Sequence, residues 1–235
     1  MTQVATQTVT PVPIGNSRTV QSSQQGVHVA LDSRVQRHLG SIWRQPFAEH
    51  NVAAFAELQR WREQQDQALP LWLDSGCGTG LSSYQLAKLN PQALVIGVDQ
   101  SSHRLQRGQM RFEMPSNGLL LRAECADLWR LMLAADYRVQ RHFLLYPNPW
   151  PKPGHLPRRW HGHPVFPDLL ALSEHIELRS NWRVYVDEMA QALSLAGRNS
   201  SISAITGTTA PPISDFEDKY RASGHDLWQL TTCQD

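Results

Sequence analysis

The sequence of 235 residues has few cysteines and no long hydrophobic run, and these absences exclude several classes of protein. Its three cysteines, Cys77, Cys125 and Cys233, are too few and too scattered for a disulfide framework or a zinc cluster, so we expect a reducing, cytoplasmic setting. No stretch approaches about 18 consecutive apolar residues, which excludes a membrane span, and the N-terminus lacks the pattern of a secretory signal. The net charge is only +1, so a globally basic nucleic-acid binder is excluded while a local basic patch is not.

Charged side chains are almost absent from the N-terminus. Residues 1–30 contain 13 serine, threonine or glutamine residues, and Arg18 is their only lysine, arginine, aspartate or glutamate. This composition, without an apolar period, predicts a mostly disordered tail followed by one domain over 31–235. An amphipathic helix is predicted over roughly 46–66 by apolar residues that recur at spacings close to three and four, namely Phe47, Ala54, Phe55, Leu58 and Trp61.

Short apolar runs then alternate with helix-length segments. We predict strands at 71–74, 94–99, 119–123, 142–146, 183–186, 201–205 and 227–230. We predict the helices between them near 81–89, 101–113, 126–135, 166–178 and 187–195. The alternation indicates an α/β fold with a mostly parallel seven-stranded sheet, right-handed crossovers and helices on both faces.

A glycine-rich turn follows the first strand and opens a helix. It reads Asp74-Ser75-Gly76-Cys77-Gly78-Thr79-Gly80, and such turns lie at the sheet edge where α/β proteins bind ligands. Asp74 at the strand end would repel a pyrophosphate but attract an ammonium group. The spacing is neither that of a dinucleotide-binding turn nor that of a P-loop. S-adenosylmethionine, which has an ammonium group and no phosphate, therefore fits better.

Acidic residues also end the next two strands. Asp99 comes 25 residues after Asp74, at a position where an acid can accept both hydroxyls of a ribose. Glu124 at the end of the third strand would face the amino group of adenine. Alone, each acid is equally well explained as an exposed loop residue or a helix N-cap. Together, after a glycine loop, they favour a nucleoside cofactor.

A rigid aromatic segment, Tyr146-Pro147-Asn148-Pro149-Trp150-Pro151-Lys152, follows the fourth strand. Asn148 lies between two prolines, which hold it in extended geometry. A fixed polar side chain beside a tryptophan face suits the binding of a nucleobase, because stacking attracts the base while the polar group reads one of its edges.

The interval 137–167 has no aspartate or glutamate, although it includes five arginine or lysine residues and four histidines. This local positive field favours contact with nucleic acid through Arg158 and Arg159, although a solvated loop explains any single residue equally well. His155, His161 and His163 have no cysteine or acid near them in sequence, so we predict no metal site.

With these motifs the sequence resembles the bacterial tRNA (guanine-N7)-methyltransferases, which methylate a guanine in the variable loop of tRNA. The resemblance covers roughly residues 15–230. It rests on the glycine turn, on Val98-Asp99, on the Pro-x-Pro-Trp-x-Lys segment with Arg158-Arg159, and on Ser214-Asp215-Phe216-Glu217-Asp218-Lys219-Tyr220. The family implies a Rossmann-like methyltransferase fold that uses S-adenosylmethionine, with tRNA as the partner.

The resemblance also implies roles for individual residues. Cofactor contacts would come from the glycine turn, Asp74, Asp99, Glu124 and Asn148, with Asp127 as the fallback for Glu124. Substrate contacts would come from Lys152, Asn181, Ser214 and Glu217. The chain departs from the family pattern at Asn148, where the family has its proposed catalytic aspartate, and at Asn181, where it also has aspartate. The N-terminal element near Arg18 has fewer arginines, and the basic run after Trp150 is interrupted by Pro153, Gly154 and Pro157. These differences indicate a divergent member.

Three hypotheses remain open at this point. The chain is an active tRNA guanine-N7 methyltransferase that tolerates asparagine, a methyltransferase with another nucleobase or an amine as substrate, or a protein that binds RNA and cofactor without turnover. The first is the function that the resemblance implies, and we expect it. The second would be supported by the donor and acceptor of Asn148, which can pair with an adenine edge.

Overall fold

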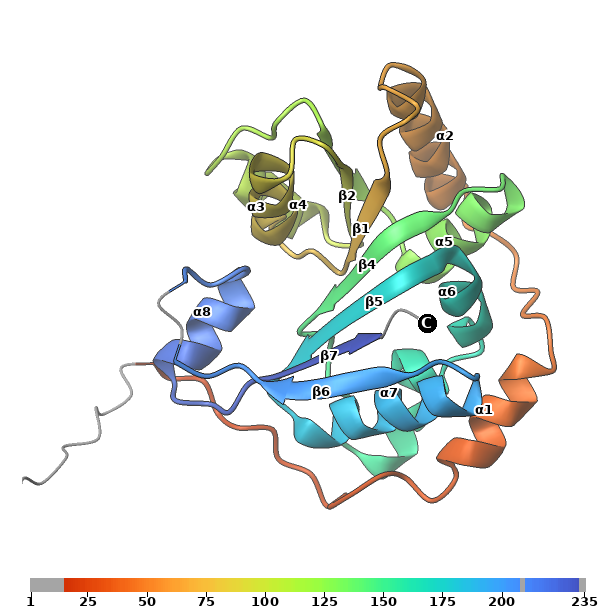
Figure 1. Cartoon of the computed structure of the whole chain (residues 1–235), viewed down its shortest axis with the longest axis vertical. Coiled ribbons are helices and arrows are strands. Elements are labelled where there is room, and N and C mark those ends of the chain that lie inside the picture. The colour runs from red at the N-terminus through yellow and green to blue at the C-terminus, as the bar shows by residue number, and fades with distance from the viewer. Residues whose placement is uncertain (1–14, 208–209, 233–235) are drawn as a thin grey trace, which may run out of the picture.

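Seven strands build one sheet at the centre of the molecule, with helices on both of its faces (Figure 1). The computed structural model describes residues 15–207 and 210–232. The strands are β1 Leu71–Ser75, β2 Leu94–Asp99, β3 Gly118–Arg122, β4 Val139–Leu145, β5 Ser173–Ser180, β6 Ser200–Ala204 and β7 Trp228–Thr232. Their order is β3-β2-β1-β4-β5-β7-β6, with β1 to β5 parallel and β7 antiparallel to both of its neighbours. The predicted mostly parallel sheet of seven strands is confirmed.

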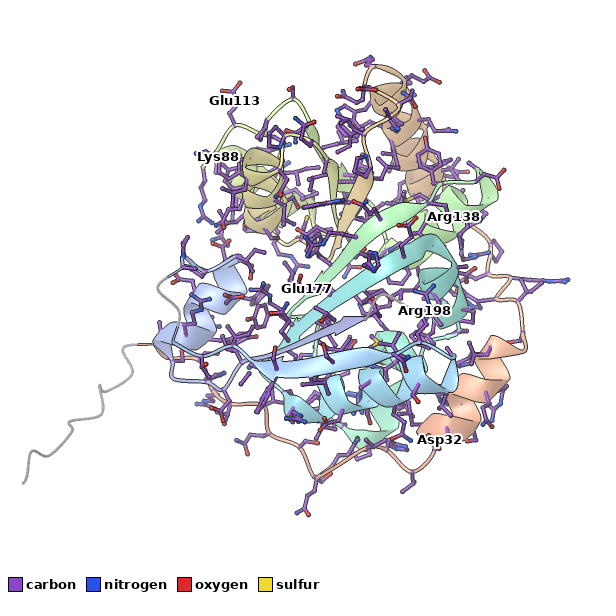
Figure 2. All side chains as sticks on the ribbon, in the orientation of Figure 1. Asp32, Lys88, Glu113, Arg138, Glu177 and Arg198 are labelled. Carbon is purple, nitrogen blue, oxygen red and sulfur yellow. The ribbon has the colours of Figure 1, made fainter. Side chains whose placement is uncertain are left out.

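The helices form two unequal layers. They are α1 Leu31–Leu39, α2 Glu49–Glu63, α3 Leu81–Leu89, α4 Ser102–Gln109, α5 Cys125–Ala134, α6 Phe166–Leu172, α7 Arg183–Leu195 and α8 Asp215–Ala222, with short 3₁₀ turns at Pro153–Arg158 and Trp160–Gly162. Side chains fill the spaces between the ribbons on both faces (Figure 2). In the part of the chain that the structure describes, no helix combines the length and apolar character needed to cross a membrane.

The sheet is buried on both faces because its strands carry apolar side chains in both directions. On β1, Leu71 and Leu73 join the larger core, which includes residues of α1, α2, α5, α6 and α7, whereas Trp72 joins a smaller core with residues of α3. Every residue of β1 and β2 is buried. This continuous burial is typical of parallel strands covered by helices, and it leaves the carboxyl ends of the strands as the edge available for ligands.

Four predicted elements differ from the structure, one of which is the helix near 101–113, because α4 ends at Gln109. The helix predicted over 46–66 corresponds to α2, which covers only Glu49–Glu63, and the helix α1 before it was not predicted. The predicted helix over 166–178 ends at Leu172, where β5 begins, because Ile176 and Leu178 alternate with polar residues in the pattern of a strand. The predicted strand over 183–186 is instead the first turn of α7. Its β-branched and aromatic residues favour a strand, but burial of Tyr185, Val186 and Met189 on one helix face outweighs that preference.

Residues 15–30 were predicted to belong to a disordered tail, and the structure corrects this. They form an extended strap, hereafter the N-terminal strap, that runs from α8 past α7 to α1 (Figure 1). At its start the amide of Gly15 donates to the carbonyl of Ala222, and the amide of Ser17 donates to Ser223 Oγ. Val20 and Val27 of the strap pack against the larger core, and side-chain hydrogen bonds of Ser22 and Gln24 to the rest of the molecule add to this packing. Residues 1–14 of the predicted tail lie outside the described residues.

Candidate active site

A cavity of about 690 Å³ opens at the carboxyl ends of the parallel strands. The loops after β1, β2, β3 and β4 all contribute to it, as the positions of the predicted motifs require. It brings together Gly76, Asp99, Glu124, Asn148 and Arg158 from the predicted site residues. Aromatic side chains from distant segments complete the walls, namely Trp43, Tyr146, Trp150, Trp160, Tyr185, Phe216 and Tyr220.

The glycine turn after β1 depends on backbone conformations that other residues rarely adopt. Gly76, Gly78 and Gly80 have φ angles of 78°, 64° and 81°. A Cβ atom at Gly80 would lie 2.7 Å from Leu120 Cδ2, whereas one at Gly76 would meet nothing within 4 Å. Gly80 is therefore required by its positive φ, and Leu120 occupies the space that a Cβ would need, whereas Gly76 leaves open space at the wall of the cavity.

Asp74 lies beneath this turn and is fully buried. Its Oδ2 accepts hydrogen bonds from Ser82 Oγ at 2.5 Å and Ser83 Oγ at 2.7 Å, at the start of α3. Burial raises the pKa of this carboxyl group to about 6, although the two serines oppose that shift. Its Oδ1 has no hydrogen-bond partner. Asp74 thus fixes the start of α3, and one buried acceptor remains free below the cavity floor.

Asp99 lines the cavity, and three partners already bind the oxygens of its carboxylate. Oδ2 accepts the amide of Gly78 at 3.0 Å, and Oδ1 accepts the amide of Ser101 at 2.8 Å and pairs with Arg104 at 3.1 Å. A carboxylate has about four acceptor positions, so binding both hydroxyls of a ribose requires one present partner to yield. Arg104 is the partner that can do so, because its side chain is 39% exposed while the two amides belong to fixed turns.

The structure distinguishes Glu124 from its alternative Asp127. Glu124 is exposed on the cavity wall, and its amide donates to Asn51 Oδ1. Asp127 is buried, and its Oδ2 accepts from Asn51 Nδ2 at 2.7 Å and from the amide of Ala48 at 3.1 Å. Asp127 therefore attaches the start of α2 to α5, and Glu124 is the acid that can reach a ligand.

Asn148 is exposed in the cavity, on the loop from Tyr146 to Trp150 that we call the base-site loop. The arginine that follows this loop, Arg158, also lines the cavity, and its guanidinium lies 4.6 Å from the centre of the Trp150 ring. Phe216 and Tyr220 present further ring faces from α8. A flat aromatic group with a polar edge can therefore stack here beside the amide of Asn148.

The prediction that Arg159 contacts RNA is wrong. Its side chain is fully buried and pairs with the buried carboxylate of Glu188 at 2.6 Å. Sequence neighbours suggested a basic surface, but Glu188 on α7 neutralises the arginine inside the protein. Arg158, which is exposed, remains the cation of this pair that can meet a phosphate.

The predicted substrate residues Lys152, Asn181, Ser214 and Glu217 do not line the cavity. Lys152 is exposed on the segment after Trp150. Ser214 is the N-cap of α8, because its Oγ accepts the amide of Glu217. Asn181 Nδ2 lies 3.0 Å from His225 Nδ1, so its amide is engaged within the protein.

A direct substrate contact by Glu217 conflicts with its complete burial. Its carboxylate pairs with Arg179 and Arg221 and accepts a hydrogen bond from the hydroxyl of Tyr146 at 2.9 Å. Glu217 therefore fixes Tyr146, which does line the cavity.

A buried histidine supports the cavity floor. Ser75 lines the cavity, and its Oγ accepts from Trp129 Nε1 at 3.0 Å and lies 2.7 Å from His142 Nε2. His142 Nδ1 lies 2.6 Å from Ser173 Oγ. Burial lowers the pKa of His142 to about 3, so the ring is neutral and each of its nitrogens has a serine partner.

Two of the other histidines in the interval 137–167 have partners within the protein. Among residues 15–207 and 210–232, the structure contains no group of three or more histidine, cysteine, aspartate or glutamate side chains placed to hold a metal ion. His161 instead contacts Glu188 at 2.8 Å, and His163 packs against Trp43.

Sequence reasoning missed Arg104 and most of the aromatic wall. Trp43 reaches the cavity from the segment between α1 and α2, and its ring lies 4.8 Å from the guanidinium of Arg130. No local pattern marks Trp43, because its place depends on how that segment packs. Arg104 had a usable signal, since it follows the predicted ribose acid by five residues, in the first turn of α4, and lines the cavity.

Comparison with known proteins shows similarity to methyltransferases. A family model described as "Putative methyltransferase" matches residues 68–230, which cover β1 to β7 almost completely. A tRNA (guanine-N(7)-)-methyltransferase of Photobacterium profundum is 26% identical over 181 residues, covering 72% of this chain and 73% of that protein. The enzyme of the same name from Geobacillus kaustophilus is 26% identical over 206 residues, covering 78% of this chain and 92% of that protein.

Solved structures show the same fold. A mutant of the 16S rRNA (adenine(1408)-N(1))-methyltransferase from Catenulisporales acidiphilia, solved with cosubstrate SAM, superposes with a TM-score of 0.53. It is 16% identical, and the match covers 74% of this chain and 89% of that one. The predicted Rossmann-like methyltransferase fold is thereby confirmed.

Proposed function

The chain belongs to this methyltransferase family, and we propose that it transfers the methyl group of S-adenosylmethionine to N7 of a guanine in tRNA. The observation that carries the proposal is the cavity itself, in which the glycine turn, two acids at successive strand ends and the base-site loop meet. The relatives named as tRNA (guanine-N(7)-)-methyltransferases support the substrate. Residues 31–235 would form the catalytic domain, together with the N-terminal strap, and we propose the cytoplasm as its compartment.

The methyl donor is S-adenosylmethionine, and the residues of the cavity suit it. Asp99 would hold the ribose and Glu124 the adenine amino group, both on the cavity wall. Near the open space at Gly76, the negative charge of Asp74 buried beneath the turn favours an ammonium group over a phosphate. When bound, the sulfonium of this cofactor supplies an electrophilic methyl group.

The reaction requires the protein to align the two reactants, and it requires no proton transfer. Guanine N7 has a free lone pair and no proton, so no general base is needed. Alignment of two reactants in one cavity can contribute about 7–11 kcal/mol to the lowering of the barrier. Trp150, Phe216 and Tyr220 would stack on the base, and Asn148 would fix its rotation. The exposed cations Lys152 and Arg158 would bind RNA phosphates.

The side-chain amide of Asn148 favours one alternative substrate, a base other than guanine. The Watson–Crick edge of guanine presents two donors, which a carboxylate accepts but an asparagine only half satisfies, at a cost of about 1–3 kcal/mol for the mismatched donor. An adenine edge presents one donor and one acceptor, which an asparagine amide complements. The second candidate function is therefore methylation of a different base, with the same cofactor and fold.

Product analysis separates these functions. The chain is incubated with labelled S-adenosylmethionine and bulk tRNA that lacks N7-methylguanosine, and the digested nucleosides are separated. We expect N7-methylguanosine as the labelled product, and we expect Asn148→Asp to retain or increase it. Label on adenine that Asn148→Asp abolishes would establish the second candidate. Binding of both tRNA and cofactor without transfer would mean that the protein has lost turnover.

A further inference from the structure

The base-site loop is held in a conformation that its own sequence does not favour. Tyr146 and Trp150, which flank the Pro-Asn-Pro sequence, have φ angles of 54° and 47°. Left-handed backbone is unfavourable for aromatic residues and costs about 1–3 kcal/mol at each position. The loop therefore keeps this shape only if the surrounding protein holds both of its ends.

The Tyr146 end is tied to β5 and α8. The amide of Tyr146 donates to the carbonyl of Arg179 at 2.8 Å, and its hydroxyl donates to Glu217. Glu217 is fully buried and pairs with Arg179 at 2.9 Å.

Arg159 holds the Trp150 end of the loop through hydrogen bonds. Nε and Nη2 of this arginine donate to the carbonyl of Trp150 at 3.2 Å and 3.0 Å, and Nη2 also donates to the carbonyl of Lys152 at 3.3 Å. Its guanidinium lies 4.8 Å from the centre of the Trp182 ring, so it is confined from the side as well. Arg159 does not line the cavity. It can act on the reaction only through the loop that it holds.

The N-terminal strap completes this attachment. Glu188 balances the charge of Arg159 through Oε2, while its Oε1 accepts Gln24 Nε2 at 2.6 Å and the amide of His28 at 3.0 Å. Arg159 Nη2 in turn donates to Gln24 Oε1 at 3.1 Å. Ser22 Oγ donates to the carbonyl of Pro151 at 2.5 Å. The strap thus contacts Pro151, the residue that directly follows the loop, and also the buried pair behind it.

We propose that Arg159 is a positioning residue for methyl transfer, and that Gln24 of the N-terminal strap acts with it to hold Asn148 and Trp150 in place. This inference rests on the proposed function, because it assigns the loop to the base. It gives the strap a part in the reaction, although neither Gln24 nor Arg159 touches the cavity. Small displacements of a positioned group matter, since about 1 Å of misplacement can reduce a rate by about 100-fold.

The test compares Arg159→Lys and Gln24→Ala with the native full-length protein. A lysine can still pair with Glu188, but its ammonium cannot bind the carbonyls of Trp150 and Lys152 in the forked arrangement of an arginine. We expect kcat for tRNA methylation to fall about 100-fold in Arg159→Lys and about tenfold in Gln24→Ala. The Kd for S-adenosylmethionine should stay within about twofold, because Asp99 and Glu124, which hold the ribose and the adenine, are untouched and Asn148 acts on the base rather than on the cofactor.

Asn117→Ala is the matched control for a purely structural effect. Asn117 Nδ2 also donates to backbone carbonyls, those of Ala87, Asn90 and Ala93, but at the opposite edge of the sheet. Its removal should lower the melting temperature without lowering kcat. Hydrogen exchange in the peptide 146–156 should accelerate in Gln24→Ala and Arg159→Lys but not in Asn117→Ala.

The outcomes are distinct. Loss of kcat with unchanged cofactor affinity and faster exchange of the loop would support the inference. Unchanged kcat in a folded Gln24→Ala protein, or an equal loss in Asn117→Ala, would overturn it. If the native protein transfers no methyl group to tRNA, the proposed function fails, and the exchange measurement still decides whether Arg159 and Gln24 hold the loop.

Discussion

The buried histidine below the cavity makes the fold sensitive to acid in a way that can be calculated. Burial lowers the pKa of His142 from 6.5 to about 3, because the charged ring would lose its hydration. The unfolded chain therefore takes up this proton first as the pH falls. The contribution to stability is fully present above about pH 6.5 and is lost progressively between about pH 6.5 and pH 3.

At pH 5 the expected loss is about 2 kcal/mol, because the pH lies about 1.5 units below the pKa of the unfolded state and each unit is worth about 1.4 kcal/mol. The substitution that isolates this effect is His142→Gln, since an amide can still pair with Ser75 but does not titrate. The free energy of unfolding is measured by urea denaturation at pH 7.5 and pH 5. The variant should be less stable at pH 7.5, yet it should lose about 2 kcal/mol less than the native protein between the two values.

Part of the acid sensitivity should survive in that variant. Burial also lowers the pKa of His163 to about 4, and it lowers the pKa of His161. His103→Gln, on an exposed position of α4, controls for the loss of one imidazole. If the native protein and His142→Gln lose the same free energy between pH 7.5 and pH 5, His142 is not held neutral in the folded state.

Three further predictions concern the cavity. Asp99→Asn should weaken the binding of S-adenosylmethionine about 10–100-fold in calorimetry, because it removes a charged acceptor; unchanged affinity would contradict the assignment of the ribose. Gly80→Ala should cost about 1–3 kcal/mol in urea unfolding, since its φ is 81° and its Cβ would strike Leu120, whereas Gly154→Ala should change stability by less than about 0.5 kcal/mol. Arg158→Ala should reduce the slope of log Kd for tRNA against the logarithm of the salt concentration by about 0.7–0.9, which corresponds to one lost phosphate contact. An unaltered slope would mean that this arginine contacts no phosphate.

The first βα unit could be predicted closely because its signals are local. The predicted helix over 81–89 coincides with α3, and the predicted strand over 94–99 coincides with β2. Glycines that must adopt positive φ marked the turn between β1 and α3, and continuous apolar runs marked the strands. Acids at strand ends could be assigned to one edge of the sheet because parallel strands all end there.

The rest of the site depends on packing between distant segments. Arg159 looked like a surface cation because its buried partner, Glu188, lies 29 residues away in the sequence. The same holds for Glu217, whose role is set by Arg179 on β5 and by Tyr146. The segment 183–186 was predicted as a strand because propensity was the only signal available there. No local pattern placed Trp43 on the cavity wall.

Transfer to a modified tRNA tests the central claim most directly. A tRNA transcript in which 7-deazaguanine replaces guanine keeps the Watson–Crick edge and the phosphates but has no nitrogen at position 7. With labelled S-adenosylmethionine, the unmodified transcript should accept a methyl group, and the 7-deaza transcript should bind with similar affinity and accept none. Equal methylation of both transcripts would contradict transfer to guanine N7 in this cavity.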